Sequence, residues 1–120
     1  MSWSGSIVDA NGDEVALRGD EAKTWRLVAD GYRAKHGVAP MSFENGVISL
    51  SSTYVAALKM GYSISTMDLS PDEVKHLAEC FAKELPRFRE DYPERAAHGE
   101  YLVSFFKTAA LFNRGIVGGH

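Results

Sequence analysis

Residues 101–112 form the most apolar stretch of the chain, and this stretch limits what the chain can fold into. It reads YLVSFFKTAALF, with nine apolar residues in twelve and Lys107 as its only charge. At 100° per residue the large side chains share one broad face, as in a helix that packs against a core. The residues on this face are Tyr101, Leu102, Phe105, Phe106, Ala109 and Phe112. A membrane span needs roughly 20 apolar residues, so the stretch predicts the buried helix of a globular domain.

The composition predicts one ordinary globular domain, comprising residues 1–120. The chain is 45% apolar and 24% charged, and its net charge is −3. A mildly acidic chain without a basic stripe disfavours nucleic acid as a partner, and nothing in it indicates a membrane. The single cysteine, Cys80, excludes an internal disulfide. Together with the lack of a secretory signal in the first residues, it indicates a cytoplasmic location.

Two Asn-Gly pairs predict two β-hairpins, because these residues favour the positive φ angles of a tight hairpin turn. With Asn11-Gly12 as the first turn, Val8 would face Val15 on the buried side. With Asn45-Gly46 as the second turn, period-two alternation and turn chemistry agree on the register. The predicted pairs of the second hairpin are Phe43 with Ile48 and Met41 with Leu50.

The tail, residues 116–120, is expected to fray.

A helix is predicted between the two hairpins. Asp20 is expected to cap its first amides, and Gly37 is placed to end it in the left-handed conformation. Its apolar stripe consists of Ala22, Trp25, Val28, Ala29 and Tyr32. Leu27 and Ala34 lie off this stripe. Single exposed apolar residues are normal, and beyond that these two are interpreted only as a candidate edge of an interface.

Further helices are predicted in the second half of the chain. A short one is expected after the serine pair 51–52, which would cap it. Ser70, a proline at the next position and Glu73 form the sequence of a capping box at the start of a longer helix. Pro86 is expected to end that helix, and Pro93 is expected to begin the last one, which contains the apolar stretch.

The order of these parts resembles a group of small, uncharacterised bacterial proteins. These have an N-terminal hairpin, a tryptophan-bearing helix and a helix of the pattern A-x-x-L-A-x-x-L-x-x-x-L-P. The matching residues are Asn11 to Glu14, Trp25, Gly37 and Val74 to Pro86. The chain departs from the pattern after this helix, where a shorter connector and a terminal Gly-Gly-aromatic segment would be expected. The resemblance implies an α+β fold and brings no activity with it.

One cluster of residues has metal-binding or catalytic chemistry. Glu73, His76 and Cys80 lie at i, i+3 and i+7 on one flank of a predicted helix. A metal centre would need further ligands, and Cys80 as a nucleophile would need His76, His36 or His98 as a base and an oxyanion hole. A solvated helix face is therefore the favoured interpretation, with no metal, cofactor or catalytic residue assigned. His98 is interpreted as a hydrogen-bonded residue of the core.

A charged segment with aromatic residues follows the same helix. The purely structural interpretation is a solvated connector whose aromatic rings pack beneath it. The functional interpretation is a protein-docking surface, because arginine and tyrosine are favoured interface anchors. The docking residues would be Arg87, Phe88, Arg89, Asp91 and Tyr92. Trp3 is a similar case, either covering the sheet edge or contacting a partner.

These patterns predict an α+β domain in which a small antiparallel sheet of two hairpins packs against three to four helices. The favoured function is a small, non-catalytic protein-binding module of the inhibitor, immunity or phage or bacterial accessory type, with a homodimer left open. The alternative is a small enzyme or ligand-binding protein with a pocket between the sheet and the helices that carry Trp25 and Tyr101.

Overall fold

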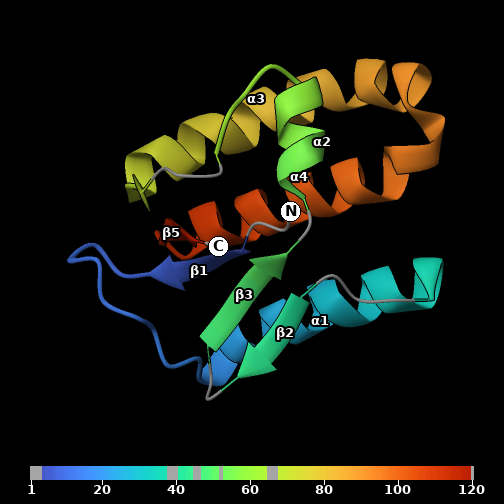
Figure 1. The fold of residues 1–120 in the computed structure, drawn as a ribbon. Coiled ribbons are helices and arrows are strands. Elements are labelled where there is room, and N and C mark those ends of the chain that lie inside the picture. Colours follow the sequence, from blue (N-terminus) through green and yellow to red (C-terminus); the bar gives the residue numbers. More distant parts are fainter. Residues whose placement is uncertain (1–3, 38–40, 45–46, 52, 65–67, 120) are drawn as a thin grey trace.

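The fold is α+β, with four α-helices and a five-stranded antiparallel sheet in the part of the chain described (Figure 1). The computed structural model describes residues 4–37, 41–44, 47–51, 53–64 and 68–119. The strands are β1 (Ser4–Val8), β2 (Met41–Glu44), β3 (Val47–Ser51), β4 (Asp68–Leu69) and β5 (Gly115–Gly119). The helices are α1 (Gly19–His36), α2 (Tyr54–Lys59), α3 (Pro71–Asp91), the 3-10 turn η1 (Pro93–Arg95) and α4 (Ala96–Leu111).

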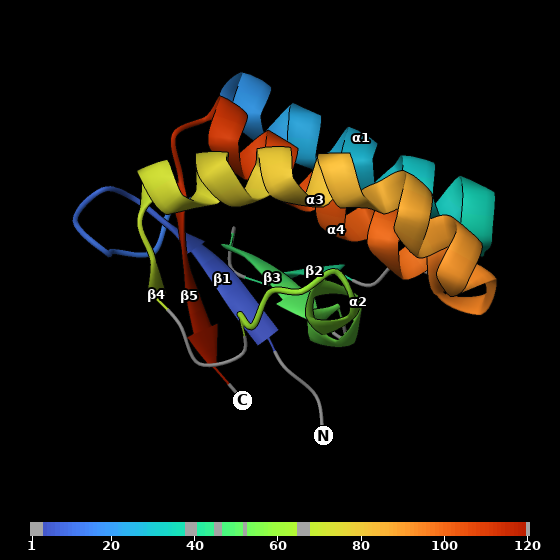
Figure 2. The same ribbon diagram turned by 90° about the horizontal axis from the view of Figure 1, so that it is seen from above.

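Helix α4 is the centre of the molecule. It contacts α1, α2 and α3, and the three long helices form one layer over one face of the sheet (Figure 2). The predicted core face is confirmed, since Tyr101, Leu102, Phe105, Phe106 and Ala109 are buried and Lys107 is exposed. Phe112, at the end of the helix, is only half-buried. The most apolar stretch of the sequence therefore forms the central helix, against which the other three α-helices pack.

The sheet has the strand order β2-β3-β1-β5-β4. The second predicted hairpin is confirmed, with Phe43 opposite Ile48 and Met41 opposite Leu50. Its Asn45-Gly46 turn lies outside the described residues. The predicted fraying of the tail is wrong, because β5 pairs with both β1 and β4 inside the sheet. Ile116 stands opposite Ile7, and both side chains are fully buried.

The first predicted hairpin is wrong, although its turn forms. The Asp9 carboxylate accepts hydrogen bonds from the N–H groups of Asn11 (2.9 Å) and Asp13 (3.0 Å), and Gly12 has a φ of +84°. Beyond the turn only the isolated bridge between Val8 and Glu14 remains. Strand β1 pairs with β3 on one side and β5 on the other. Because both of its edges are occupied, residues 15–17 have no strand to join.

Two predicted helix caps are also wrong. Helix α1 begins after Arg18, which makes no side-chain cap, and Asp20 lies inside the first turn, where its charge suits the helix dipole. Helix α2 begins after Thr53 rather than after the serine pair, of which Ser51 ends β3. The predicted end of α1 is confirmed, since Gly37 is left-handed with a φ of +79°. In both cases the helix begins within two residues of the predicted position, and the observed N-cap residue makes no side-chain cap.

The capping box at the start of α3 is confirmed. The Glu73 N–H donates to the Ser70 hydroxyl (3.2 Å), and the Ser70 N–H donates to the Glu73 carboxylate (3.0 Å). This second hydrogen bond is the main cause of a lowered pKa at Glu73. The two bonds satisfy amides that a helix terminus otherwise leaves without partners.

Substitution of Ser70 by alanine is expected to lower the free energy of unfolding by about 1 kcal/mol, because it removes this cap. Urea melts should show a lower midpoint with an unchanged slope. Ser104→Ala is the control, since Ser104 is an exposed serine in the interior of α4. Equal midpoints for Ser70→Ala and the wild type would show that the hydroxyl contributes nothing at this terminus.

Pro86 does not end α3, which continues to Asp91. A proline inside a helix costs about 3 kcal/mol through its missing N–H and its clash with the preceding turn. The extra turns bury Phe88 completely against α4. At the contact α4 carries Gly99, where a Cβ atom would lie 2.6 Å from the Phe88 ring. Burial of a phenylalanine against a glycine therefore offsets the cost of the internal proline.

Candidate functional site

The residues predicted to dock a partner lie at the C-terminal end of α3 and just beyond it, in a helix rather than a connector. Phe88 is completely buried and contacts the Tyr92 ring at a centroid distance of 5.5 Å. Arg89 lies 3.0 Å from Glu100 of α4. Phe88 is thus part of the core of this chain and is not available to a partner.

The remaining members of that set are engaged within the chain. Arg87 pairs with Glu84 at 2.7 Å and with Asp91 at 3.3 Å along the same helix. Lys59 of α2 lies over the Tyr92 ring, 4.4 Å from its centre. A docking role for this end of α3 stays a prediction, and its aromatic residues already join α2, α3 and α4. Trp3 lies outside the described residues.

The Glu73, His76 and Cys80 flank has the geometry that the sequence predicts. The Cys80 sulfur lies 3.5 Å from Nε2 of His76, and a hydrogen bond with Cys80 raises the pKa of the Tyr62 hydroxyl. Glu73 is engaged in the capping box. Across the described residues, no group of three or more histidine, cysteine or acidic side chains is arranged to hold a metal ion. His98 is half-buried rather than part of the core.

The structure brings together a different set of residues, between α1 and α4. A hollow of about 280 Å³ opens there on the helix layer. Its lining residues are Leu27, Val28, Gly31, Tyr32, Lys35, Glu100, Tyr101 and Ser104. A Cβ atom at Gly31 would meet no heavy atom within 4 Å, so the missing side chain leaves space on this side of α1. The Tyr32 and Tyr101 rings meet edge to face, 5.1 Å apart.

One end of the hollow is closed by charges. Glu100 accepts from Lys35 of α1 at 2.9 Å and pairs with Arg89 of α3 at 3.0 Å. The hydrogen bond from Lys35 is the main cause of a lowered pKa at Glu100. The Lys35 side chain is 64% exposed, so the pair adds little stability. Through its contacts with Lys35 and Arg89, Glu100 links α1, α3 and α4 beside the hollow.

Tyr101 supplies a buried polar atom at the hollow. Its side chain is 1% exposed, and its hydroxyl has no hydrogen-bond partner among the described residues. Burial, with a smaller contribution from Tyr32, strongly raises the pKa of Tyr101. Burial likewise raises the pKa of Tyr32. Both tyrosines are therefore protonated and uncharged at neutral pH.

Removing that hydroxyl should not weaken the fold. Tyr101→Phe is expected to leave the free energy of unfolding unchanged or to raise it. The largest increase expected is about 3 kcal/mol, because the variant lacks an unsatisfied buried polar group. Tyr101→Ala, which also removes the ring, should be destabilising by several times that margin. Denaturant melts of both variants measure the difference. A clear loss of stability in Tyr101→Phe would show that the hydroxyl has a partner.

Exposed leucines border this surface. Leu27, at the hollow, is 64% exposed, and Leu111 is 72% exposed on α4. Leu111 follows Ser104 by seven residues and therefore lies on the same side of α4. The sequence marked Leu27 and Ala34 as residues off the core stripe, but it did not indicate the hollow. The sequence feature that could have indicated the hollow is Gly31, because a glycine in the interior of a helix has no local role in capping or turning the chain.

No protein-family model, no curated protein and no solved structure matches the chain. Among the described helices, none is both long enough and apolar enough to cross a membrane.

Proposed function

We propose that this chain is a small, non-catalytic protein-binding module that contacts its partner through α1 and the hollow between α1 and α4. The observation that carries the proposal is the 64%-exposed Leu27 beside a hollow of about 280 Å³. We place the module in the cytoplasm and in the inhibitor, immunity or accessory class. The single cysteine and the small size of the chain support these assignments.

An exposed leucine beside a concavity has the chemistry of an interface core. Full burial of such a side chain contributes about 1.5–3 kcal/mol, and anchors in pockets dominate the energy of many interfaces. The charges at the hollow support recognition rather than proton transfer. Glu100 pairs with Lys35 and Arg89, and its pKa is lowered, mainly by the hydrogen bond from Lys35, whereas the pKa values of Tyr32 and Tyr101 are raised. Glu100, Tyr32 and Tyr101 therefore do not supply a base that titrates near neutral pH.

Photocross-linking from inside the hollow tests the proposal. A benzoylphenylalanine at position 31 has room, because a Cβ there meets nothing within 4 Å. In cells that produce the protein naturally, we expect it to capture one protein. The purified partner should then bind the wild type, and Leu27→Glu should weaken that binding at least about tenfold, or about 1.4 kcal/mol.

The control uses the other side of the molecule. Leu58 of α2 is also an exposed helical leucine, at 49%. The same cross-linker at position 58 should capture a different set of proteins or none, and Leu58→Glu should leave binding of the purified partner unchanged. Capture of the same proteins from both positions, or no capture from position 31, would contradict the proposal.

A second candidate function is the binding of a small polar ligand in the same hollow. The unpartnered Tyr101 hydroxyl favours it, since ligand sites combine apolar walls with a few polar groups. The hollow lies between two helices and includes no residue of the sheet, unlike the pocket predicted from sequence. Small molecules that raise the Tm of the wild type, but not of Gly31→Trp, which fills the hollow, would support this candidate.

A further inference from the structure

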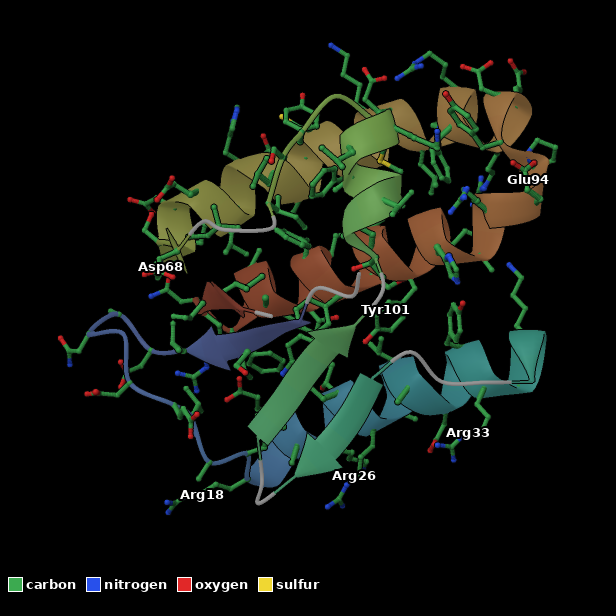
Figure 3. The ribbon with its side chains drawn as sticks, viewed as in Figure 1. Arg18, Arg26, Arg33, Asp68, Glu94 and Tyr101 are labelled. Atoms are coloured by element: carbon green, nitrogen blue, oxygen red, sulfur yellow. The ribbon has the colours of Figure 1, made fainter. Side chains whose placement is uncertain are left out.

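Helix α1 lies at one border of the helix layer and exposes a long side of its surface. Its exposed ridge consists of Lys23, Arg26, Leu27, Asp30, Arg33 and Ala34. Arg26 and Arg33 are seven residues apart and share one line along the helix, about 10 Å long. Leu27 and Ala34 form a parallel line beside it. In Figure 3, Arg18, Arg26 and Arg33 follow the same lower border of the molecule and point away from α4.

Arg26 and Arg33 differ from three of the four arginines that follow α1 in the chain. Arg87, Arg89 and Arg114 each pair with a carboxylate. Within the ranges that the structure describes, Arg26 and Arg33 make no ion pair. Asp30 lies between them on the ridge without pairing with either, and Lys23 adds a cation one turn away. The ridge therefore keeps an excess of positive charge, since none of the described carboxylates pairs with Arg26 or Arg33.

This local charge is opposite to that of the whole molecule. Residues 18–36 contain five lysines and arginines against three acids, whereas the full chain has 13 against 16. Of these charges, Lys35 is paired with Glu100, and Glu21 is paired with Arg114 of the α4–β5 connection through two hydrogen bonds, so the excess of cations remains. An anionic group approaching α1 thus meets unpaired cations, and the same group approaching α3 meets an excess of acids.

We propose that the partner presents an acidic amphipathic helix to the exposed ridge of α1. Its apolar side covers Leu27 and Ala34, and its carboxylates meet Arg26 and Arg33. Arginine suits this role because its guanidinium binds a carboxylate through two parallel hydrogen bonds. Helices that lie on a partner surface are recognised through apolar anchors at the same seven-residue repeat. This inference rests on the proposed function, since it names the chemistry of the partner at that site.

The alternatives fit the ridge less well. A phosphate backbone offers no apolar counterpart to Leu27 and Ala34, and proteins that bind it carry a basic surface with a high isoelectric point, whereas this chain has a net charge of −3. An anionic membrane surface is bound by helices with a wide apolar face and a cationic polar face. Here the apolar line has two residues, and Asp30 interrupts the cations.

A titration with designed peptides tests the inference. The first probe is a peptide of leucine, alanine and glutamate, about 20 residues long so that it forms a helix. The second has lysine in place of every glutamate. We expect the full-length protein to bind the glutamate peptide at least about tenfold more tightly than the lysine peptide, which corresponds to about 1.4 kcal/mol. The double variant Arg26→Glu/Arg33→Glu should reverse this preference, and added salt should weaken it.

The matched control moves the same change to α3. Lys75 and Lys83 are exposed helical lysines without ion pairs in the described structure, and Lys75→Glu/Lys83→Glu alters the net charge equally. Binding of the glutamate peptide to this control should stay within about twofold of the wild type, since charges far apart are screened by salt. Circular dichroism of both double variants verifies that each remains folded.

Three results would overturn the inference. They are equal binding of the two peptides, equal effects of the two double variants, and tighter binding of duplex DNA or phosphatidylserine vesicles than of the glutamate peptide. Failure of the proposed function is distinguishable, because it appears as no capture from position 31. In one further outcome, capture persists and depends on Leu27 while the protein shows no preference between the two peptides. That result would support the docking site and contradict the proposal that the partner presents an acidic helix.

Discussion

Replacement of Phe105 by alanine is expected to lower the free energy of unfolding by about 3–5 kcal/mol, through lost burial and a residual cavity. Phe105 is completely buried, and its ring lies 4.8 Å from that of Trp25 and 6.0 Å from that of Tyr101. A domain of this size has only about 5–15 kcal/mol in total. The variant should therefore melt far below the wild type or accumulate as a poorly soluble product.

The neighbouring Lys107 provides the control for this experiment. Its side chain is exposed on the same helix, so Lys107→Ala should leave the thermal melt almost unchanged. Both variants can be compared by thermal melts at one protein concentration. If Phe105→Ala melted like the wild type, α4 could not be the centre of the core, and the packing described for α1 would also be in doubt.

The second large effect is expected at Gly115, the first residue of β5. A Cβ atom at this position would lie 2.6 Å from the main-chain oxygen of Leu69 and 3.3 Å from the Val8 side chain. The oxygen belongs to β4, so it can yield only if that strand moves. Overpacking of this kind typically costs about 1–3 kcal/mol. Gly115→Ala should reach the upper end of that range, because it also displaces the residue before the Ser70 cap.

A second glycine variant separates the effect of the steric clash from the general effect of replacing glycine by alanine. Gly31 lies inside α1, and a Cβ there would meet nothing within 4 Å. Gly31→Ala is expected to stabilise the protein by about 0.5–1 kcal/mol, since alanine favours the helix over glycine. Urea midpoints should therefore move in opposite directions for the two variants. A loss of stability in both would show that the close approach at Gly115 is not the cause.

The features that could be predicted from sequence are those whose causes lie within a few residues. The capping box at Ser70, the left-handed end of α1 at Gly37 and the register of the second hairpin each depend on short-range chemistry. The core face of α4 is similar, because a helical period and large apolar side chains determine it together. In these places local preference and tertiary packing favour the same structure.

The errors arise where a distant segment decides the outcome. Asn11-Gly12 forms a turn, yet β3 and β5 occupy both edges of β1 and exclude residues 15–17. Pro86 would end an isolated helix, yet Gly99 of α4 makes room for Phe88 two residues later. In both cases the deciding contact joins residues that the sequence pattern gives no reason to bring together.

The candidate site was only partly predictable for the same reason. Leu27 and Ala34 could be identified as residues off the core stripe, because periodicity within one helix shows this. The hollow depends on how α1 packs against α4, and in particular on Gly31 and Ser104 being small where the helices face each other. The docking prediction at the end of α3 was based on the arginine and aromatic content of that segment. Composition alone does not show that Phe88 is buried in the core.

The position of β5 between β1 and β4 also affects when the protein can fold. Of the five strands of this sheet, β1 is synthesised first, and β5, which covers one of its edges, is synthesised last. Until β5 has emerged, β1 exposes an open edge, and α3 lacks a strand that it contacts in the finished fold. Such edges are prone to aggregation during synthesis. The sheet therefore closes only after β5 has been translated, and any chaperone that binds the nascent chain would be needed most just before that moment.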